Sequence, residues 1–398
     1  MVCRNDQALD QPPVAFLADD SRFPAARAAV SLLLSTIFCG ATMKAIIVRQ
    51  LVLSEPKQLV IEEYEDRQLE PKEVRLQTLY SGISAGTELT SYHGSSPHLN
   101  KRWDSGRRLF VASEGDGVRY PVRDLGYEEV GQVVECGPDV TELAEGQLVY
   151  GPWGHRTHHI ADEEFVRQRL LPSDLDPVLG IFAHIGATAL NGVHDANIRI
   201  GETVAIFGLG VVGQIVAQLA KRSGAYVVGI DLYDKRLSLA TDLKAIDLAI
   251  NASDGSAAEQ IKDITNKRGA DVSIEVTGAT RALNEAIRAT AYASRVVAMG
   301  FYQGEATGLF LGEEFHHSRI NVVCSQISGV APEASYRWNR IRLYQTIMRL
   351  QAEGVLSLKP LITHMFPFDQ ATEAFHTIVQ QPAETLQVVI DFTQPIRN

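Results

Sequence analysis

The chain has 398 residues, which is long enough for two domains that each bury a substantial core. Its hydrophobic content of 45% is that of an ordinary globular protein. The formal net charge of −11 argues against non-specific binding to nucleic acid or to an anionic membrane. We therefore expect a small molecule as the partner, with no nucleic acid and no membrane.

The four cysteines are too scattered for a disulfide framework or for a zinc site made of four thiolates, because no two of them form a Cys-x-x-Cys pair. This usage favours a reducing compartment, and we expect a cytoplasmic protein. The cysteines are Cys3, Cys39, Cys136 and Cys324.

Residues 1–42 differ in character from the rest of the chain. Four aspartates precede their apolar run, where a secretory signal would carry basic residues. The apolar run itself, residues 28–41, is shorter than a membrane span. We predict a disordered extension, or a natural start at Met43, and exclude this segment from the fold.

From Met43 the pattern is one of strands separated by turns. It predicts a small β-rich, barrel-like domain that ends near Asp176, followed by a first helix at residues 181–193. The strand-like runs lie at residues 44–48, 59–63, 73–80, 130–135 and 147–150.

The stretch from Thr203 to Asp231 organises the second half of the chain. A buried, β-branched run leads directly into a glycine-rich loop, and a helical pattern follows to about Ser223. In such a loop the first glycine allows a tight turn, the second lets the backbone approach a pyrophosphate, and the third lets helix and strand pack closely. The free N–H groups of the helix then face the phosphates. This context predicts a dinucleotide site formed by Gly208, Gly210, Val211, Val212 and Gly213.

Asp231 ends the next buried run and indicates which dinucleotide binds. Its carboxylate can accept hydrogen bonds from both ribose hydroxyls of the adenosine and would repel a 2′-phosphate. We therefore predict NAD rather than NADP. Lys235 and Arg236 follow closely and could meet a phosphate, so Arg236 is a further candidate contact with the cofactor.

Strands and helices continue to alternate after Asp231, which predicts a parallel, doubly wound sheet. Strands are expected at residues 270–278 and 294–301, with a helix at 283–291 between them. The tail is expected to form a helix at 338–352 and a β-α-β segment at 361–391 that returns to the first domain. Ligands of such sheets bind at the carboxyl ends of the strands, so the cofactor should be lined by Thr277, Gly278, Gly300 and Phe301.

With these features the chain resembles the medium-chain dehydrogenase/reductase superfamily from about Met43 to Phe392. The resemblance implies an α/β protein with a GroES-like catalytic domain, at residues 43–184 and 331–398, and a Rossmann domain at 185–330. It also implies a homodimer or homotetramer that moves hydride between a nicotinamide and an alcohol, ketone, quinone or enone, in a cleft between the domains. Besides the glycine loop, it is carried by Pro71-Lys72-Glu73-Val74, Ser81-Gly82-Ile83-Ser84, Gly126-Tyr127-Glu128-Glu129-Val130-Gly131 and Leu358-Lys359-Pro360-Leu361-Ile362.

Two positions depart from the zinc alcohol dehydrogenases of this superfamily. Those enzymes carry a cysteine where this chain has Ser84 and a histidine where it has Tyr127, and their four-cysteine lobe for a second zinc is missing. The third metal position falls on His184 when Thr188 is matched to the threonine that contacts the nicotinamide. A slip of one residue would place Ala183 there instead.

Catalytic zinc normally takes three nitrogen, sulfur or carboxylate donors around an open position. His184 and Glu128 leave this site one donor short, so we predict that no catalytic zinc is bound. The variant motifs around Ser84 and Tyr127 are similar to those of the branch that contains bacteriochlorophyllide a dehydrogenase, which oxidises a hydroxyethyl group to an acetyl group.

Without a metal, another group must polarise the substrate carbonyl and carry its proton. The resemblance places Tyr127 on the substrate side of the cleft, and Ser84 and Thr87 could form a proton shuttle with it. Alternatively, the Tyr127 ring only fills the space of the lost zinc. Glu128 is expected to be structural more often than catalytic, and His184 is either a proton relay or a core residue.

Two histidine clusters invite a metal interpretation that their context disfavours. Residues 154–159 are expected on a strand, where only His155 and His159 could face the same side. His316 and His317 form a loop pair with no third ligand nearby in the sequence.

Two classes of function remain open. The first is an NAD-dependent oxidoreductase that interconverts a secondary alcohol, of a sugar, a cyclitol or a hydroxyethyl group, and its ketone. A zinc-free enone or quinone reductase is the alternative among enzymes, although it would usually prefer NADPH, which Asp231 disfavours. The second class is a non-catalytic nucleotide-binding protein of the same fold. The lost zinc ligands favour the second class, whereas the complete cofactor loop and the polar cleft residues favour the first.

Overall fold

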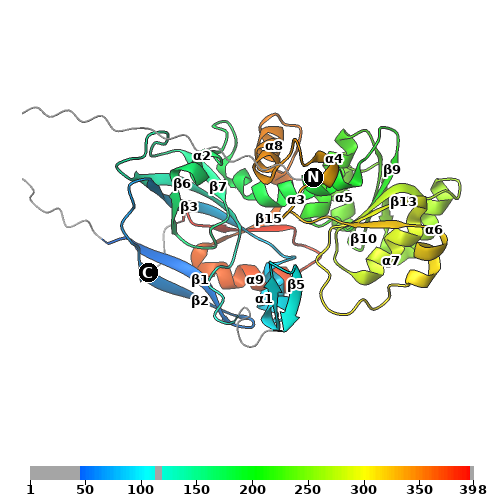
Figure 1. The fold of residues 1–398 in the computed structure, drawn as a ribbon, viewed down its shortest axis with the longest axis horizontal. Helices are drawn as coiled ribbons and strands as arrows, with labels where there is room; N and C mark the ends of the chain where they lie inside the picture. Colours follow the sequence, from blue (N-terminus) through cyan, green and yellow to red (C-terminus); the bar gives the residue numbers. More distant parts are fainter. Residues whose placement is uncertain (1–44, 113–118, 395–398) are drawn as a thin grey trace, which may run out of the picture. The chain divides into compact units, whose positions relative to one another are not determined.

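A parallel sheet of six strands organises the second half of the chain (Figure 1). The structure is a computed structural model, and it describes residues 45–112 and 119–394. Each neighbouring pair of strands in this sheet runs parallel. The strands are β9 (Thr203–Phe207), β10 (Tyr226–Asp231), β11 (Leu248–Asn251), β12 (Ala270–Glu275), β13 (Thr290–Ala298) and β14 (Asn321–Cys324). Their order is β11-β10-β9-β12-β13-β14. The strands that follow β9 are thus added first on one side of it and then on the other, as in dinucleotide-binding sheets.

Alternate residues of β9 face opposite layers of helices. Val204 and Ile206 belong to the core cluster that contains α3 (Phe182–Ala196), α4 (Val211–Arg222) and α5 (Asp234–Asp242). Ala205 and Phe207 belong to the cluster that contains α6 (Ala257–Ile264) and α7 (Thr280–Ala289). Because both faces are covered, the strand is a continuous apolar run rather than an alternating one.

The first half of the chain and the tail share a mixed sheet. Its order is β15-β16-β3-β6-β7, and β8 also pairs with β3. Strand β16 runs antiparallel to β3 with Val388 opposite Ile83, so the tail returns to the first half. The strands are β3 (Glu73–Ile83), β6 (Glu128–Cys136), β7 (Leu148–Gly151), β8 (His158–Asp162), β15 (Ile362–Pro367) and β16 (Gln387–Asp391).

Shorter elements complete the described chain. Two hairpins are formed by β1 (Ile47–Glu55) with β2 (Gln58–Glu65) and by β4 (Lys101–Asp104) with β5 (Leu109–Ala112). The remaining α-helices are α1 (Glu88–Tyr92), α2 (Glu163–Arg167), α8 (Arg340–Ala352) and α9 (Ala371–Gln380). Single helical turns lie at Pro97–Leu99, Pro177–Ile181, Ala252–Asp254, Leu311–Phe315, Pro332–Ala334, Lys359–Leu361 and Phe368–Gln370.

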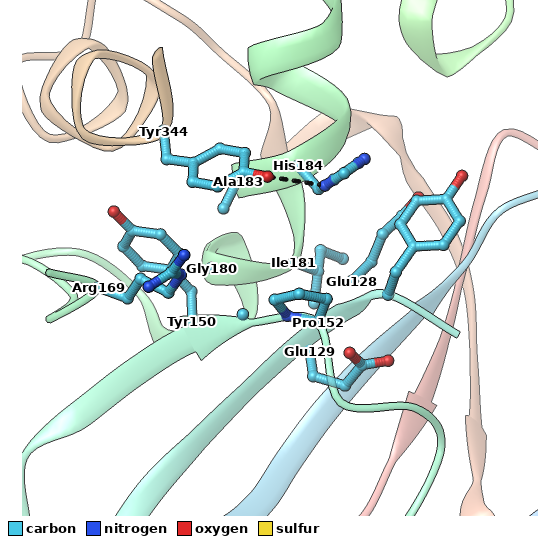
Figure 2. Close-up of a pocket in the computed structure, with 12 residues that line it drawn as sticks. Glu128, Glu129, Tyr150, Pro152, Arg169, Gly180, Ile181, Ala183, His184 and Tyr344 are labelled. Atoms are coloured by element: carbon cyan, nitrogen blue, oxygen red, sulfur yellow. Dashed lines mark hydrogen bonds between the residues drawn. The ribbon is translucent and has the colours of Figure 1, made fainter. Parts of the chain in front are cut away.

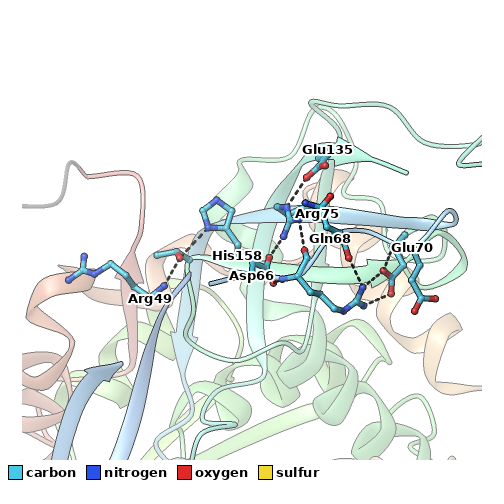
Figure 3. A network of polar contacts seen from close by, with 10 residues as sticks. Arg49, Asp66, Gln68, Glu70, Arg75, Glu135 and His158 are labelled. Atoms are coloured by element: carbon cyan, nitrogen blue, oxygen red, sulfur yellow. Dashed lines mark hydrogen bonds and ion pairs between the residues drawn. The ribbon is translucent and has the colours of Figure 1, made fainter. Parts of the chain in front are cut away.

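A buried arginine ties two strands of the mixed sheet to the segment that follows β2 (Figure 3). Arg75 on β3 is 4% exposed, and its guanidinium bonds the carboxylates of Asp66 and Glu135, the latter at 2.8 Å. It also donates to the carbonyl oxygen of Arg67 at 3.0 Å. Arg67 in turn holds both carboxylate oxygens of Glu73, at 2.6 and 2.5 Å. Because each buried charge has hydrogen-bonded partners, this network is structural.

The expected helices at 181–193 and 338–352 and the expected β-α-β tail are present as α3, α8 and β15-α9-β16. The boundary expected at residue 291 is wrong, since α7 ends at Ala289 and β13 begins at Thr290. Thr290 is drawn into the sheet because it pairs with Ala270 and its hydroxyl bonds Ser273 Oγ on β12 at 2.7 Å. The extension expected at residues 1–42 lies outside the described residues. Within 45–112 and 119–394, we find no helix with the length and apolar character that a membrane crossing needs.

Candidate active site

In the glycine loop after β9, Gly213 lies directly against the backbone of Gly208. Gly208 has a φ of +98°, a conformation that favours glycine. A Cβ on Gly213 would lie 1.9 Å from the carbonyl oxygen of Gly208, so a glycine is needed for α4 to begin this close to β9. The cap of α4 is Gly210, which has no side chain to occupy the first N–H groups of Val211 and Val212. The loop therefore fits a pyrophosphate at the start of α4.

Asp231, at the end of β10, is directed at the same loop. Its Oδ2 accepts a hydrogen bond from the Leu209 N–H at 2.7 Å, and its Oδ1 accepts one from the Tyr233 N–H at 3.0 Å. Each carboxylate oxygen has a second lone pair, so both can still accept a ribose hydroxyl. Arg236 is tied to the tail, since its Nη2 donates to the Pro382 carbonyl oxygen at 2.7 Å. Its Nη1 lies 3.8 Å from Asp231 Oδ2.

A carboxylate that the sequence did not single out holds the ends of β12 and β13 together. Glu275 is fully buried, and its two oxygens accept hydrogen bonds from the Thr277 N–H at 2.7 Å and the Gly278 N–H at 3.3 Å. The hydroxyl of Tyr302, beyond β13, also bonds it. Burial raises the pKa of Glu275. A Cβ on Gly300 would lie 2.2 Å from the Gly278 nitrogen, so the two loops touch. The predicted lining residues Thr277, Gly278, Gly300 and Phe301 thus lie at two adjoining strand ends.

Three hydroxyls meet on the other side of the candidate site. Ser84 Oγ is hydrogen-bonded to the Tyr127 hydroxyl, which donates to Thr87 Oγ1 at 3.2 Å. The pairing of β3 with β6 places Gly82 opposite Glu128, which brings the ends of these strands together. Ser84 is buried and Thr87 is exposed, so the three hydroxyls lead from the interior to the surface. Burial, and then the charge of Glu128, raise the pKa of Tyr127, so the phenol keeps its proton near neutrality.

His184, on α3, lies beside this group. The ring centroids of Tyr127 and His184 are 4.8 Å apart. Figure 2 shows Tyr344, from α8, pointing at His184, and its hydroxyl lies 3.1 Å from His184 Nδ1. Burial, and then Arg340, lower the pKa of His184 to about 4, so the imidazole is neutral at pH 7. Thr188, one turn later, donates to the His184 carbonyl oxygen at 3.0 Å.

Glu128 is buried next to Tyr127, with the side-chain amide of Gln387 beside its carboxyl group. Burial, and then the charges of Glu88 and Glu129, raise the pKa of Glu128 well above its ordinary value. A Cβ on Gly82 would lie 2.6 Å from Glu128 Oε2, so this glycine makes room for the acid.

These side chains do not suit zinc. Zinc prefers thiolate, imidazole and carboxylate donors. Here the side chains are the Ser84 hydroxyl, the Tyr127 phenol that bonds it, the carboxyl group of Glu128 and the imidazole of His184, whose Nδ1 already bonds Tyr344. Among the residues that the structure describes, no three His, Cys, Asp or Glu side chains are grouped to hold a metal ion.

A second polar group adjoins Ser84 and joins four segments of the chain. His155 Nε2 lies 2.8 Å from Glu88 Oε2, and His155 Nδ1 lies 2.6 Å from Ser81 Oγ. The Ser81 hydroxyl donates to Glu129 Oε1 at 2.9 Å. The other oxygen of Glu88 accepts the Ser84 N–H at 2.8 Å. Sequence reasoning did not single out Glu88 or Glu129. Their only signal was that each is an acidic residue beside one of the two motifs that contain Ser84 and Tyr127.

The expectation that residues 154–159 lie on one strand is wrong for His155. Strand β8 begins at His158, and His155 lies in the preceding loop, where its N–H bonds the Leu125 carbonyl oxygen. His159 instead stacks on Trp153, with the rings 5.7 Å apart and 8° from parallel. The two histidines therefore have separate partners. His316 and His317 contact each other, with their ring centroids 5.4 Å apart.

Comparison with known proteins gives the following similarities. The sequence model of the family described as zinc-binding dehydrogenase matches residues 211–341. D-guloside 3-dehydrogenase of Escherichia coli K12 is 32% identical over 352 residues, which cover 86% of this chain and 100% of that protein. The protein of the same name from Shigella flexneri matches to the same extent.

Solved structures share the fold. L-idonate 5-dehydrogenase from Escherichia coli has a TM-score of 0.71 at 20% identity, with 88% of this chain and 99% of that chain covered. A protein described as a short chain alcohol dehydrogenase, from Escherichia coli CFT073 and solved in complex with NADH, has a TM-score of 0.69 at 18% identity, with coverage of 88% and 100%.

Proposed function

Because the chain belongs to the zinc-type alcohol dehydrogenase-like family of the medium-chain dehydrogenase/reductase superfamily, we propose that it interconverts a secondary alcohol of a sugar or glycoside and its ketone, using NAD and no catalytic zinc. Family membership makes it an oxidoreductase that acts on CH–OH groups with a nicotinamide cofactor. The observation that carries the proposal is the meeting of Ser84, Thr87 and Tyr127 hydroxyls beside His184, in a chain with a complete nucleotide loop.

The relative that matches over its whole length supports the substrate class, since it is named for a glycoside. The chemistry of the site agrees with such a substrate. Hydroxyl groups both donate and accept hydrogen bonds, so the three at this site can pair with the hydroxyls of a sugar ring.

Asp231 supports NAD over NADP. A 2′-phosphate would face its carboxylate, and each of the two neighbouring cations already has a partner elsewhere. Arg236 bonds backbone carbonyls of the tail, and Lys235 pairs with Glu384 at 2.6 Å. When bound, NAD takes up the hydride of the alcohol carbon or returns it to the ketone.

Tyr127 is the group that we propose to handle the proton of the substrate oxygen. In ketone reduction the phenol donates its proton to the oxygen as the hydride arrives at the carbon. The Thr87 hydroxyl then resupplies that proton from the exposed side, while Ser84 bonds the phenol from the buried side. Oxidation of the alcohol reverses each step. Because the pKa of Tyr127 is raised, the phenol stays protonated near neutrality, which favours reduction, and oxidation should speed up with rising pH.

A substrate panel tests this proposal. Purified protein is assayed with NAD⁺ and with NADP⁺ on methyl hexopyranosides, free hexoses, cyclitols and simple secondary alcohols, and with NADH and NADPH on ketones, enones and quinones. We expect the highest kcat/KM for a glycoside with NAD⁺. Reduction of enones or quinones with NADPH in preference, or cofactor binding without any turnover, would refute it.

A further inference from the structure

The proposed reaction leaves a set of buried polar residues beside Ser84 without a role. We call Ser81, Glu88, Glu129 and His155 the histidine cluster. Ser81 and His155 are 0% exposed, Glu129 is 1% exposed and Glu88 is 3% exposed. Ionisable groups this deeply buried are costly unless each one is paired and hydrogen-bonded, so the arrangement of the cluster calls for an explanation.

The hydrogen bonds of the cluster assign a positive charge to His155. Burial raises the pKa of Glu129, whereas His155, the Trp153 N–H and Ser81 act to lower it. An ionised Glu129 can only accept, so the Ser81 hydroxyl donates to Glu129 Oε1 and its oxygen accepts from His155 Nδ1. His155 Nε2 faces a carboxylate oxygen of Glu88, to which it can only donate. Both ring nitrogens therefore carry protons. The imidazolium lies between two carboxylates, and the Phe375 ring is at its edge, 6.2 Å away between centroids. The like charge of Arg156 acts against the protonated ring.

The serine, histidine and acid of the cluster are connected as in a nucleophilic triad, but they cannot act as one. A nucleophilic serine needs access to substrate and a neutral histidine to take its proton. Ser81 is fully buried, and its proton points away from His155 toward Glu129. The cluster is thus not a second active site. Any effect that it has on the reaction must pass through its contacts with the proposed catalytic residues.

Two contacts join the cluster to the proposed catalytic hydroxyls. Through Glu88, which bonds His155 with one oxygen and the Ser84 N–H with the other, the cluster holds the backbone of Ser84. Through Gly126, it packs against the residue that precedes Tyr127. Gly126 has a φ of +97°, and a Cβ there would lie 2.8 Å from His155 Nδ1 and from Glu129 Oε1.

We propose that His155 is a positioning residue for the proposed alcohol–ketone reaction, which acts through Glu88 and Ser84 to hold the Ser84 hydroxyl against that of Tyr127. The proposal rests on the proposed function, because its effect is exerted on the proton that Tyr127 handles. If the imidazolium is removed, Glu88 and Glu129 become two buried carboxylates with no cation between them. Glu88 then has reason to turn toward water and release the Ser84 N–H.

The test combines His155→Gln with Tyr127→Phe. In the otherwise unchanged protein, His155→Gln should lower kcat on the order of 10²-fold, because misplacing a catalytic group by about 1 Å has that effect. In the Tyr127→Phe background, where the hydroxyl to be positioned is absent, the same substitution should change the residual kcat by less than about threefold. NADH affinity should stay unchanged in both, since no contact of the cluster reaches the glycine loop.

His159→Gln is the matched control. It removes a histidine from the same segment that stacks on Trp153 and touches neither Glu88 nor Ser84, so kcat should be unaffected. If His155→Gln lowers kcat by the same factor in the original protein and in the Tyr127→Phe background, the proposal is overturned, because a purely structural effect does not depend on the Tyr127 hydroxyl. If His155→Gln does not fold, Ser81→Ala, which removes one partner of the ring, should show the same dependence on Tyr127 with a smaller loss. If Ser81→Ala lowers kcat equally in both backgrounds, the proposal fails as well.

Failure of the proposed function would look different. Tyr127→Phe alone would then leave kcat intact, whatever His155→Gln does.

Discussion

The cofactor side and the proton-handling side of the candidate site are built in opposite ways. The cofactor side takes its main contacts from one continuous stretch, in which Gly213 packs on Gly208 and Asp231 bonds Leu209. The proton-handling side collects its groups from β3, β6, the loop before β8 and α3, which are far apart in the sequence. A glycine loop carries its geometry in its own spacing, whereas the other side receives its geometry from the pairing of β3 with β6.

This difference explains how one side can change its chemistry while the fold is kept. The strand pairing fixes where the side chains at positions 84 and 127 meet, whatever they are. Replacing a thiol and an imidazole there by a hydroxyl and a phenol removes metal donors without disturbing a backbone contact. On the cofactor side, by contrast, a single Cβ at Gly213 would collide with the backbone.

The largest effect is expected from Tyr127→Phe, which keeps the ring and removes the hydroxyl. If Tyr127 is the acid, kcat should fall by about 10²–10⁴-fold, the usual contribution of a positioned acid–base group. NADH affinity, measured by fluorescence titration, should be unchanged. Tyr120→Phe, which removes a hydroxyl bonded to the Ser91 carbonyl oxygen, is the control and should leave kcat intact. Turnover within a few-fold of the original would mean that the ring is only filling space.

Asp231→Ala probes the cofactor side and should alter binding rather than chemistry. Loss of a charged hydrogen-bond partner costs about 1.5–3 kcal/mol, so NADH affinity should fall roughly 10- to 100-fold. The preference for NADH over NADPH should narrow, since the repulsion of a 2′-phosphate disappears as well. Asp247→Ala is the matched control, because Asp247 accepts the Val227 N–H at 2.8 Å at the opposite end of β10. Tighter binding of NADPH than of NADH by the unchanged protein would contradict the assignment of NAD.

The same contrast decides what could be predicted from the sequence. The glycine loop and Asp231 were placed correctly relative to the strands because their spacing is local. The partnership of His155 with Glu88 spans 67 positions and depends on how two loops pack, which no periodicity encodes. Glu275 was passed over because an acid at the end of a buried strand has no signal of its own until Thr277, Gly278 and Tyr302 are seen to surround it.

Stability at alkaline pH should depend on His155. Burial acts to lower the pKa of His155, but the charges and the hydrogen bond of Glu88 and the charge of Glu129 outweigh it and raise the pKa above the ordinary 6.5. A raised pKa in the folded state means that the stabilisation is complete below pH 6.5 and is lost as pH rises through the folded-state pKa. The urea midpoint of unfolding should therefore fall above pH 6.5, and fall less in His155→Gln. Parallel pH profiles of the two proteins would show that the ring carries no charge.

Removing metal ions is expected to have no effect on kcat, which is the smallest effect predicted. The proposed reaction polarises the ketone through the Tyr127 hydroxyl, so dialysis against a chelator should leave kcat unchanged, while a zinc-dependent alcohol dehydrogenase treated in parallel loses activity. Elemental analysis should find far less than one zinc per chain. A stoichiometric zinc that leaves together with activity would refute the hydroxyl mechanism and make His184 the first ligand to test.

Two substitutions in the chain allow a more stringent test of the zinc content. Ser84→Cys combined with Tyr127→His would place a thiolate and an imidazole where the strand pairing already brings positions 84 and 127 together, beside His184. Three such donors around an open position are what catalytic zinc requires, so the doubly substituted protein should bind about one zinc per chain. If it binds zinc and the unchanged protein does not, the identity of two side chains on a fixed backbone decides which chemistry the site performs.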